Sequence, residues 1–542
     1  MSPPTPLWRL LAPTGSTFKE TSEFFDRILS EKSYADPIRW ARFMWYARFV
    51  QELHIIAFGT EDKHKQIIYA LVEHNGGESI FPALQTLWWS PSSYSDTSYF
   101  PLFTPQLRSA ILNFSYSSEA GIQDPLDRGF LAQLHVSSPR LDYLCVDVSW
   151  GPLGVDQLTV IPSFEHLTDL ALLATTSLTW LLKFATMPRM KCVRVAYVKS
   201  SKAELSRPPT QAHAPHLTAI SVGGNCNDQL KMEHAGIAPR TTVGLSVPLS
   251  QPITSALNLN HTGGLGPSWV SRNCPTLARL FTALDAPRLA SASFHAMSND
   301  RHDADYISCI EALATACPPS AMEALCIALD EDGGPQMLEY LTDLLDPLLP
   351  FHNITHFRLS CLMVALVADD DDLWAIARAW PKLQKFELWQ AHWDNHADPD
   401  EDSDSDEDED RDGLGIPTPV ALASFRDHCP DLRELVLPHL DFDADMPTPQ
   451  RMRPWGREPQ HGLKILGFGA KDLGGDDGDF RVQGRASKPD DRQVAGWARY
   501  VLDLFPKLDA EKSLSRCGSF STEKGWREVL KRARDLRKSG VA

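Results

Sequence analysis

A short apolar triplet recurs along the whole chain and limits its fold more than any other feature. Each copy has an apolar residue, two free positions, a second apolar residue, one free position and a third apolar residue, as in Leu84, Leu87 and Trp89. Two residues that lie two positions apart in a strand point to the same side, and the residue between them points to the other. The triplet therefore predicts a short strand with one buried face.

The triplet occurs thirteen times. The copies are Val50-Leu53-Ile55, Leu84-Leu87-Trp89, Leu107-Ala110-Leu112, Leu141-Leu144-Val146, Leu167-Leu170-Leu172, Met190-Val193-Val195, Leu217-Ile220-Val222, Leu289-Ala292-Phe294, Met322-Leu325-Ile327, Ile354-Phe357-Leu359, Leu383-Phe386-Leu388, Leu432-Leu435-Leu437 and Leu463-Leu466-Phe468. In eight of them a proline stands two residues before the first apolar position, far more often than chance would place one there: Pro82, Pro105, Pro139, Pro188, Pro215, Pro287, Pro381 and Pro430. Proline lacks the N–H that a helix needs and moves the preceding residue toward extended conformations. We expect a helix to stop at each proline and a strand to follow.

Helical spacing upstream of the triplets agrees with this order. Two apolar series have it: Tyr306, Cys309, Ile310, Leu313 and Cys317, and then Leu373, Ile376, Ala377 and Trp380. Asp369 to Asp372 is the expected acidic first turn of the second helix, where carboxylates complement the helix dipole. Thr418 and Pro419 are expected to open a further helix as N-cap and first helical residue.

The spacing of the triplets predicts a repeat architecture. Successive first positions are mostly 23 to 34 residues apart, in or slightly above the range of leucine-rich repeats. We expect an α/β fold, an irregular leucine-rich-repeat-like solenoid with parallel strands on one face and helices on the other, over residues 36–510. Residues 1–35 would form an N-terminal linker or helical segment and residues 511–542 a basic C-terminal helix or tail. The alternative is a doubly wound α/β sheet, which also alternates strands with helices.

Two intervals are too long for one repeat. The interval from Leu217 to Leu289 has 72 residues and contains a stretch at 238–271 rich in Pro, Gly, Ser and Thr, which predicts a loop excursion. The interval from Leu383 to Leu432 has 49 residues and contains an acidic insertion at 394–415. Eleven acids lie between Asp398 and Asp412, and such a run repels itself, so we expect disorder.

The acidic insertion contains two candidate phosphorylation sites. Ser403 and Ser405 each have an acid three residues later, which resembles the preference of acid-directed casein-type kinases. The alternative is a loop that only aids solubility. At the carboxyl end, basic residues among Trp526, Leu530 and Leu536 predict a terminal helix with a solvated face, or else a nuclear-localisation or nucleic-acid patch. The overall pI of about 5.4 makes nucleic-acid binding unlikely.

Motifs for catalysis are absent from the sequence. It has no H-E-x-x-H, Walker A, G-x-S-x-G or dinucleotide-binding motif. His392 and His396 border the acidic insertion, where a rigid metal pair is not expected. We therefore predict no enzyme, no cofactor and no metal site. The ten cysteines form no C-x-x-C pair, and no long apolar segment begins the chain, so we expect an intracellular protein, cytoplasmic or nuclear, with no membrane partner.

Three passages carry a family resemblance: P-L-W-R-L-L at 6–11, R-W-A-R-F-M-W-Y-A-R-F-V-Q-E-L at 39–53 and G-E-S-I-F-P-A-L-Q-T-L at 77–87. With the P-x-L-x-x-L motifs as far as Leu508, they resemble the F-box proteins with irregular leucine-rich repeats of mushroom-forming fungi, in the portion after the F-box. In that family the F-box binds a Skp-type adaptor of a ubiquitin ligase. The F-box itself is not found here, because Met1 falls where the linker after it would lie.

The resemblance implies a protein-interaction module that selects substrates, with a Skp-type adaptor as partner only if an F-box lies upstream. A ligase-independent scaffold or a truncated remnant is the alternative, and an α/β enzyme is less favoured. The outward strand positions would then bind an unknown protein partner. The candidates are His54, Trp88, Arg194, Arg358 and Glu387.

Overall fold

The computed structural model describes most of the chain. The described residues are 10–11, 21–55, 61–89, 100–113, 129–152, 155–200, 202–206, 208, 210–223, 274–298, 304–331, 336–338, 341–361, 364–390, 417–438, 440–441, 461–468, 491–517 and 523–540. The expected loop at 238–271, the acidic insertion at 394–415 with Ser403 and Ser405, and the pair His392 and His396 lie outside these residues.

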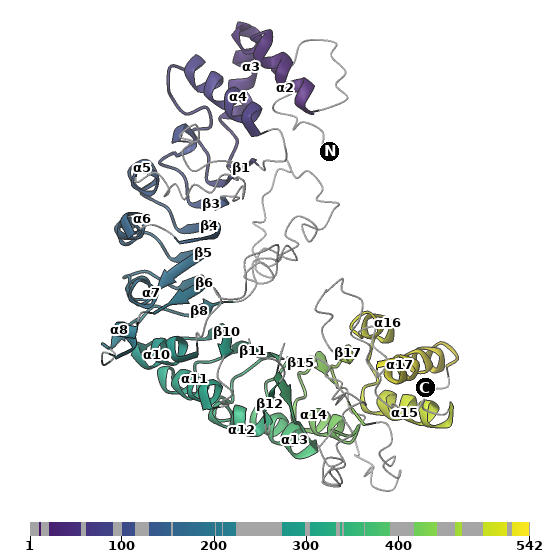
Figure 1. Ribbon diagram of the computed structural model, residues 1–542. Coiled ribbons are helices and arrows are strands. Elements are labelled where there is room, and N and C mark those ends of the chain that lie inside the picture. Colours follow the sequence, from purple (N-terminus) through teal and green to yellow (C-terminus); the bar gives the residue numbers. More distant parts are fainter. Residues whose placement is uncertain are drawn as a thin grey trace, which may run out of the picture. The chain divides into compact units, whose positions relative to one another are not determined.

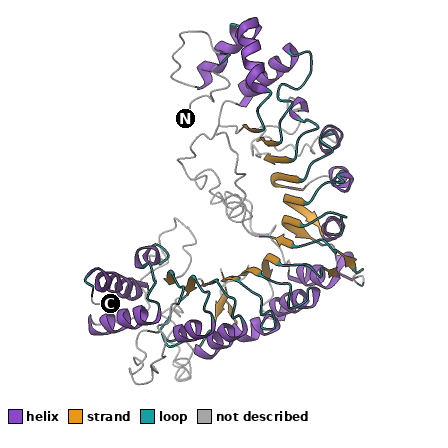
Figure 2. Ribbon diagram, turned by 180° about the vertical axis from the view of Figure 1, so that it is seen from behind, coloured by secondary structure: helices purple, strands orange, loops and turns teal. Residues whose placement is uncertain are grey.

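The chain divides into two compact units. The first contains residues 1–201 and 212–259, and the second contains residues 202–211 and 260–542. In both units strands alternate with helices, and most of the helices in each unit lie on one side of the strands (Figures 1 and 2). The protein is thus an α/β fold built on parallel strands.

In the first unit seven strands follow one another in chain order, each parallel to the next. They are β1 (Glu52–Ile55), β2 (Thr86–Trp89), β3 (Ser109–Asn113), β4 (Tyr143–Pro152), β5 (Asp169–Ser177), β6 (Cys192–Lys199) and β8 (Ala219–Val222). The described helices are α2 (Thr21–Ser30), η1 (Ser33–Ala35), α3 (Pro37–Ala47), α4 (Glu61–His74), η2 (Phe100–Leu102), α5 (Phe130–Ser137), α6 (Val155–Val160), η3 (Ile161–Ser163) and α7 (Leu178–Ala185), and the short strand β7 is Ala212–His213.

In the second unit six strands run in the same manner. They are β10 (Ser291–Ser298), β11 (Ala324–Glu331), β13 (His356–Cys361), β15 (Lys385–Gln390), β16 (Glu434–Leu437) and β17 (Ile465–Phe468), with β9 (Leu284–Asp285), β12 (Gln336–Leu338) and β14 (Val364–Leu366) as short additions. The described helices are α8 (Lys202–Ser206), α10 (Cys274–Ala283), α11 (Ala304–Ala316), α12 (Leu341–Leu345), η6 (Asp346–Leu348), α13 (Asp370–Ala379), α14 (Ala421–His428), α15 (Asp491–Leu504), α16 (Ala510–Leu514) and α17 (Glu523–Lys538).

Each of these thirteen strands contains the second and third residues of one triplet. Every triplet side chain that the structure describes is buried, Leu84 and Leu388 among them. The prediction of strands at these positions is confirmed, and so are the two predicted helices, which are α11 and α13. All nine residues of their apolar series are buried.

The prolines occupy a defined turn between helix and strand. The N–H of the first triplet residue donates to the carbonyl three residues earlier, as from Leu84 to Phe81 and from Leu383 to Trp380, both at 3.1 Å. Proline therefore stands at the second position of a four-residue turn, where its fixed φ is favourable. The residue before each of the eight prolines is buried, so the turn also anchors a side chain in the core.

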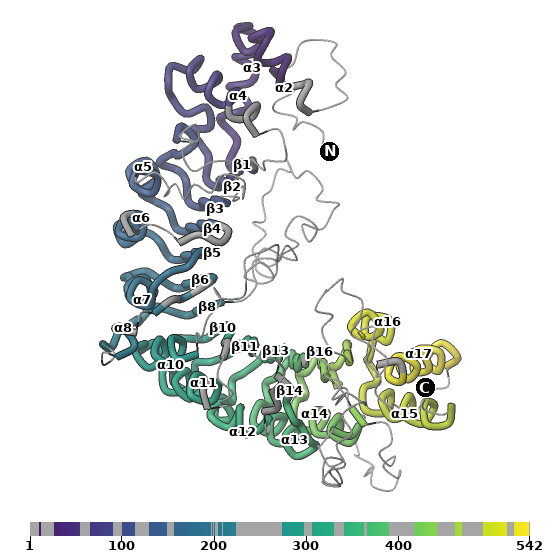
Figure 3. The backbone as a smooth tube through the Cα atoms, viewed as in Figure 1, coloured from purple at the N-terminus to yellow at the C-terminus, as the bar shows by residue number. Residues whose placement is uncertain are grey.

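A regular hydrogen-bond step links successive turns within each unit. In the second unit the N–H groups of Arg433 and Glu434 both donate to the carbonyl of Gln384, at 2.8 and 3.2 Å. The step continues after the last strand, because the N–H of Asp509 donates to the carbonyl of Lys464 at 2.7 Å. There the chain forms α16 instead of a strand, as its backbone path shows (Figure 3).

Two helix starts test the capping predictions. α13 begins with a capping box in which the Asp369 side chain accepts from the N–H of Asp372 at 2.9 Å, so the acidic first turn is confirmed. The prediction at Thr418 is wrong by two residues, since α14 begins at Ala421 with Val420 as N-cap. The Thr418 hydroxyl still makes a cap-type bond, because it accepts from the N–H of Val420 at 3.2 Å. The N–H and hydroxyl of Thr418 also donate to the Asp370 carboxylate, at 2.7 and 2.6 Å.

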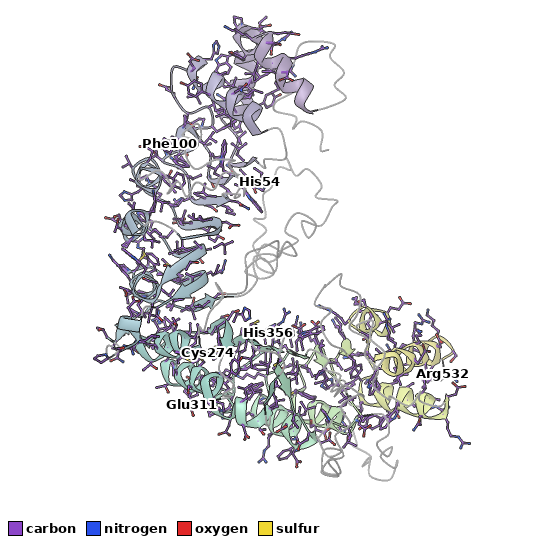
Figure 4. All side chains as sticks on the ribbon, viewed as in Figure 1. His54, Phe100, Cys274, Glu311, His356 and Arg532 are labelled. Atoms are coloured by element: carbon purple, nitrogen blue, oxygen red, sulfur yellow. The ribbon has the colours of Figure 1, made fainter. Side chains whose placement is uncertain are left out.

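The basic carboxyl end packs against the second unit through one face. Trp526 is buried and stacks on Phe468 with the ring centroids 4.2 Å apart. Val529, Leu530 and Ala533 of α17 are also buried, and α17 packs on α15 and α16. Arg532 is exposed on the opposite side (Figure 4), as is Lys531, whereas the Arg537 guanidinium donates to the carbonyls of Pro506 and Leu508.

Candidate functional site

The candidate site is the face of the strands that points away from the triplet side chains. Parallel pairing in register places the middle residue of each triplet strand beside its counterpart on the next strand. His54 thus pairs with Trp88 in the first unit, and Arg358 pairs with Glu387 in the second. Figure 4 labels His54 and His356 on the strands of the two units, whereas Cys274 and Glu311 mark the helices. The sequence-predicted residues therefore belong to two separate rows.

In the second unit the row is a chain of ion pairs across three strands. Glu387 on β15 forms ion pairs with Arg358 on β13, with Nε and Oε2 3.8 Å apart, and with Lys385, with Nζ and Oε1 3.1 Å apart. The same Lys385 ammonium lies 3.3 Å from Oε2 of Glu434 on β16. Arg516, after α16, places Nη2 3.0 Å from the other oxygen of Glu434. We call these five residues the charged row.

The charged row presents its cations outward. The side chains of Glu387 and Glu434 are 4% and 14% exposed, whereas those of Lys385, Arg358 and Arg516 are 24% to 43% exposed. The carboxylates lie deeper, where they hold the long cationic side chains in fixed positions. The groups accessible to a partner are therefore cationic side chains whose positions are already ordered.

A glycine makes room for the last cation of the row. Gly467 lies opposite Val436 in register, at the outward position of β17. A Cβ there would be 3.0 Å from the Cβ of Arg516 and 3.2 Å from its carbonyl oxygen. Any larger residue would push Arg516 away from Glu434, so Gly467 positions the end of the charged row.

His356 lies next to the charged row, paired in register with Lys385. Its pKa is lowered from the ordinary value, first by partial burial and then by the nearby Lys385 ammonium, while Glu387 and Glu434 act in the opposite direction. Its Nδ1 is 2.9 Å from the hydroxyl of Thr355. The imidazole is therefore held neutral at pH 7 beside a cation.

The row of the first unit has a different character. The His54 ring lies 5.3 Å from the Trp88 ring, and its Nε2 is 2.5 Å from Oε1 of Glu52. His54 is exposed and Trp88 partly exposed, but Arg194 is buried at 6% exposure. Between Trp88 and Arg194 the row holds three uncharged residues, Ile111, Cys145 and Ala171.

Sequence reasoning found two members of the charged row and missed three. Lys385 and Glu434 precede the second triplet residue of their strands, a position that also points outward. The alternation in K-F-E-L and E-L-V-L could have identified them. Arg516 follows a helix outside the triplets, and no local pattern marks it.

The described residues were also compared with what a metal site, a membrane-spanning helix and a reactive thiol require. In the described part of the chain no group of three or more His, Cys, Asp or Glu side chains could hold a metal ion. A search of the same residues finds no helix with the length and apolar character to cross a membrane. Eight of the nine described cysteines are buried, and burial raises the pKa of Cys317 and Cys429 to about 12, which keeps these thiols protonated.

Comparison with known proteins gives no assignment. No protein-family model and no curated protein matches the chain.

Proposed function

We propose that this protein is a protein-interaction module that binds a carboxylate-bearing partner through the charged row of its second unit. In this proposal the strands and helices are leucine-rich-repeat-like, and the module resembles the substrate-recognition part of an F-box ubiquitin-ligase adaptor. The chain would meet a Skp-type adaptor only with an F-box upstream of residue 1. Without it, the same surface serves a ligase-independent scaffold or is a remnant.

One observation supports the proposal above all others: in the charged row the carboxylates are buried more deeply than the cations. Three cations are held by two deeper carboxylates, so their side-chain entropy is already reduced before a partner arrives. Preordered arginine donors match the planar geometry of a carboxylate. A partner with spaced Asp or Glu side chains would therefore gain charge-assisted hydrogen bonds at little ordering cost.

A protein partner fits this surface better than a nucleic acid. The charged row has three cations and two anions, so its net charge is small, and the whole chain carries −18. Nucleic-acid surfaces need broad positive potential along a phosphate backbone. Spaced carboxylates on a folded or extended protein segment need only a few placed cations.

Binding of defined acidic peptides tests the proposal. Fluorescein-labelled peptides with spaced Glu residues, and the same peptides with Gln, would be titrated with the full chain at two salt concentrations. We expect binding of the Glu peptides alone, weakened by salt and weakened about tenfold or more by Arg358→Gln with Lys385→Gln. The matched control is Arg108→Gln, which removes an exposed first-unit arginine paired with Asp142 at 3.3 Å. Equal binding by the double variant and the native chain would contradict the proposal.

The adaptor question has a separate test. A purified Skp-type adaptor mixed with this chain should elute apart from it in gel filtration, and should co-elute with a chain extended by an F-box. Co-elution with the present chain would show that the docking element lies within it.

A further inference from the structure

A second surface, on α3 of the first unit, has the composition of a binding site. Large apolar side chains that remain exposed are few in the described residues, and four of them lie between positions 38 and 49: Ile38, Trp45, Tyr46 and Phe49. The ring-bearing side chains Trp45 and Phe49 are 56% and 62% exposed. Exposed aromatic residues gathered on one short segment mark interaction sites, whereas single ones do not.

The exposure does not come from a poorly packed helix. The opposite face of α3 is buried through Phe43 and Ala47, and Phe43 contacts Phe81 with the ring centroids 6.4 Å apart. Trp40 packs edge-on against His74 at 4.7 Å. The side chain of Asp36 caps the first turn by accepting from the N–H of Ile38 at 2.9 Å. α3 is thus fixed in place beside α2 and α4 (Figure 1). Its second apolar face remains exposed.

The outer face is ordered around one arginine. The Arg48 guanidinium carbon lies 3.6 Å from the centre of the Trp45 ring and 4.8 Å from that of Phe49. The two rings are 6.1 Å apart and nearly perpendicular. Within the part of the chain that the structure describes, this guanidinium has no carboxylate and no hydrogen-bond acceptor as partner. Its flat faces meet the rings, and its N–H edge is free to donate.

The charge of the segment selects the kind of partner. Between Pro37 and Val50 there are three arginines, Arg39, Arg42 and Arg48, and no acid, in a chain whose net charge is −18. Arg39 is paired with Asp36 at 3.4 Å, which leaves Arg42 and Arg48 to a partner. Ile38, Arg42 and Trp45 follow the spacing i, i+4, i+7, so a cation and apolar groups lie along one stripe of α3. Phe49 follows directly after the helix and lies against Trp45.

We propose that this outer face of α3 binds an acidic protein segment in which carboxylates alternate with large apolar side chains. The apolar groups would cover Ile38 and Phe49, and a carboxylate would accept two hydrogen bonds from the edge of Arg48. A lipid surface fits less well, because membrane-bound helices keep cations and aromatic residues on different faces, whereas here they share one face. This surface is separate from the charged row.

Direct binding measurements with defined probes test this proposal. The probes are fluorescein-labelled peptides that alternate Glu with Leu and Phe, the same peptides with Gln for Glu or Ser for the apolar residues, and vesicles of phosphatidylserine with phosphatidylcholine. The titrations use the full chain with Arg358→Gln and Lys385→Gln, so that spaced Glu residues do not bind the charged row. We expect this chain to bind only the Glu peptides with apolar residues. Trp45→Ala or Arg48→Gln should weaken that binding about tenfold or more. Arg48→Lys should not restore it, since an ammonium lacks the planar fork.

The chain supplies a matched control. On α13 of the second unit Trp374 is also exposed, and the Arg378 guanidinium lies 5.1 Å from its ring, but acids of the first turn lie on the same helix. Trp374→Ala should leave peptide binding unchanged in the chain with Arg358→Gln and Lys385→Gln. Because that chain has lost the two cations of the charged row, binding that still depends on Trp45 separates this proposal from the function proposed above. Binding that is unaffected by both Trp45→Ala and Arg48→Gln, equal binding of the Gln peptides, or Trp45-dependent binding of vesicles alone would overturn it.

Discussion

The strand faces of the two units share one backbone plan and carry different chemistry. Both have the buried triplet, the proline turn and the same hydrogen-bond step between neighbouring strands. Yet the outward row of the first unit passes through Ile111, Cys145 and Ala171, whereas that of the second holds Arg358 and Glu387 at equivalent positions. The inward residues are apolar in every repeat, whereas the outward ones differ from strand to strand. The same backbone plan thus carries a mostly uncharged outer face in one unit and ion pairs in the other.

The turns differ from repeat to repeat as well. In the first unit the buried residues before two prolines are joined by hydroxyl bonds, from Ser138 to the carbonyl of Thr104 and from Thr104 to that of Leu84, both at 3.0 Å. In the other turns the corresponding buried residues are apolar: Phe81, Met187 and Ala214 in the first unit, and Ala286, Trp380 and Cys429 in the second. Small polar side chains and a large aromatic one thus perform the same task in the core.

The largest expected effect on stability comes from substitutions of the buried residues in these turns. Trp380→Ala should destabilise the second unit by about 3–5 kcal/mol, because it removes a fully buried ring that contacts Phe357 at 4.7 Å and donates to Leu348. Ser138→Ala should cost the first unit about 1 kcal/mol, the value of one buried hydrogen bond. Urea unfolding followed by circular dichroism measures both. Similar losses would show that the two turns are not packed as differently as the side chains suggest.

A smaller effect is expected in the charged row. Glu387→Gln should destabilise the second unit by about 1–3 kcal/mol, because Lys385 and Arg358 lose the carboxylate between them while they remain partly buried. Glu52→Gln in the first unit should stay within about 0.5 kcal/mol, since its partner His54 is well exposed. Urea midpoints in low and high salt provide the measurement. A Glu387→Gln chain as stable as the native one would mean that the charged row is not held by its carboxylates.

The smallest effect is a pH dependence of the second unit. The pKa of His461 is lowered first by burial, and its ring bridges the carbonyl of Cys429 at 2.9 Å and the N–H of Leu463 at 3.2 Å. Its folded pKa lies below the unfolded value of about 6.5, so the unfolded state takes up the proton first. Stability should be complete above that value and should decline as the pH falls below it. Amide exchange at Leu463, compared at neutral and mildly acidic pH, is expected to show lower protection in acid. Unchanged acid sensitivity in His461→Gln would exclude this residue as the cause.

Much of the fold could be predicted because its signals are local. A triplet such as Leu432, Leu435 and Leu437 specifies a strand and its buried face within six residues, and proline marks the turn before it. Buried helical stripes such as that of Leu373 and Ile376 are equally local. The start of α14 was missed because Thr418 is held by Asp370, a residue 48 positions earlier in the chain.

The surfaces were harder to predict because they depend on register and packing. The charged row needs Lys385 and Glu434 side by side, although 49 residues separate them, and it ends at Arg516 from a different kind of element. On α3 the sequence is apolar around much of the helix, which is typical of a buried helix. Only its packing through Phe43 and Ala47 shows that Trp45 and Phe49 remain outside.

The structure that follows β17 affects the tendency of the second unit to aggregate through its strand edge. The outer side of β17 does not carry a full row of open backbone groups, because the N–H of Leu466 donates to the Ser513 hydroxyl at 3.0 Å and the carbonyl of Lys464 accepts from Asp509. Open strand edges recruit further strands and lead to polymers and amyloid-like aggregates. By turning into α16 at this point, the chain protects this edge against growth by strand addition.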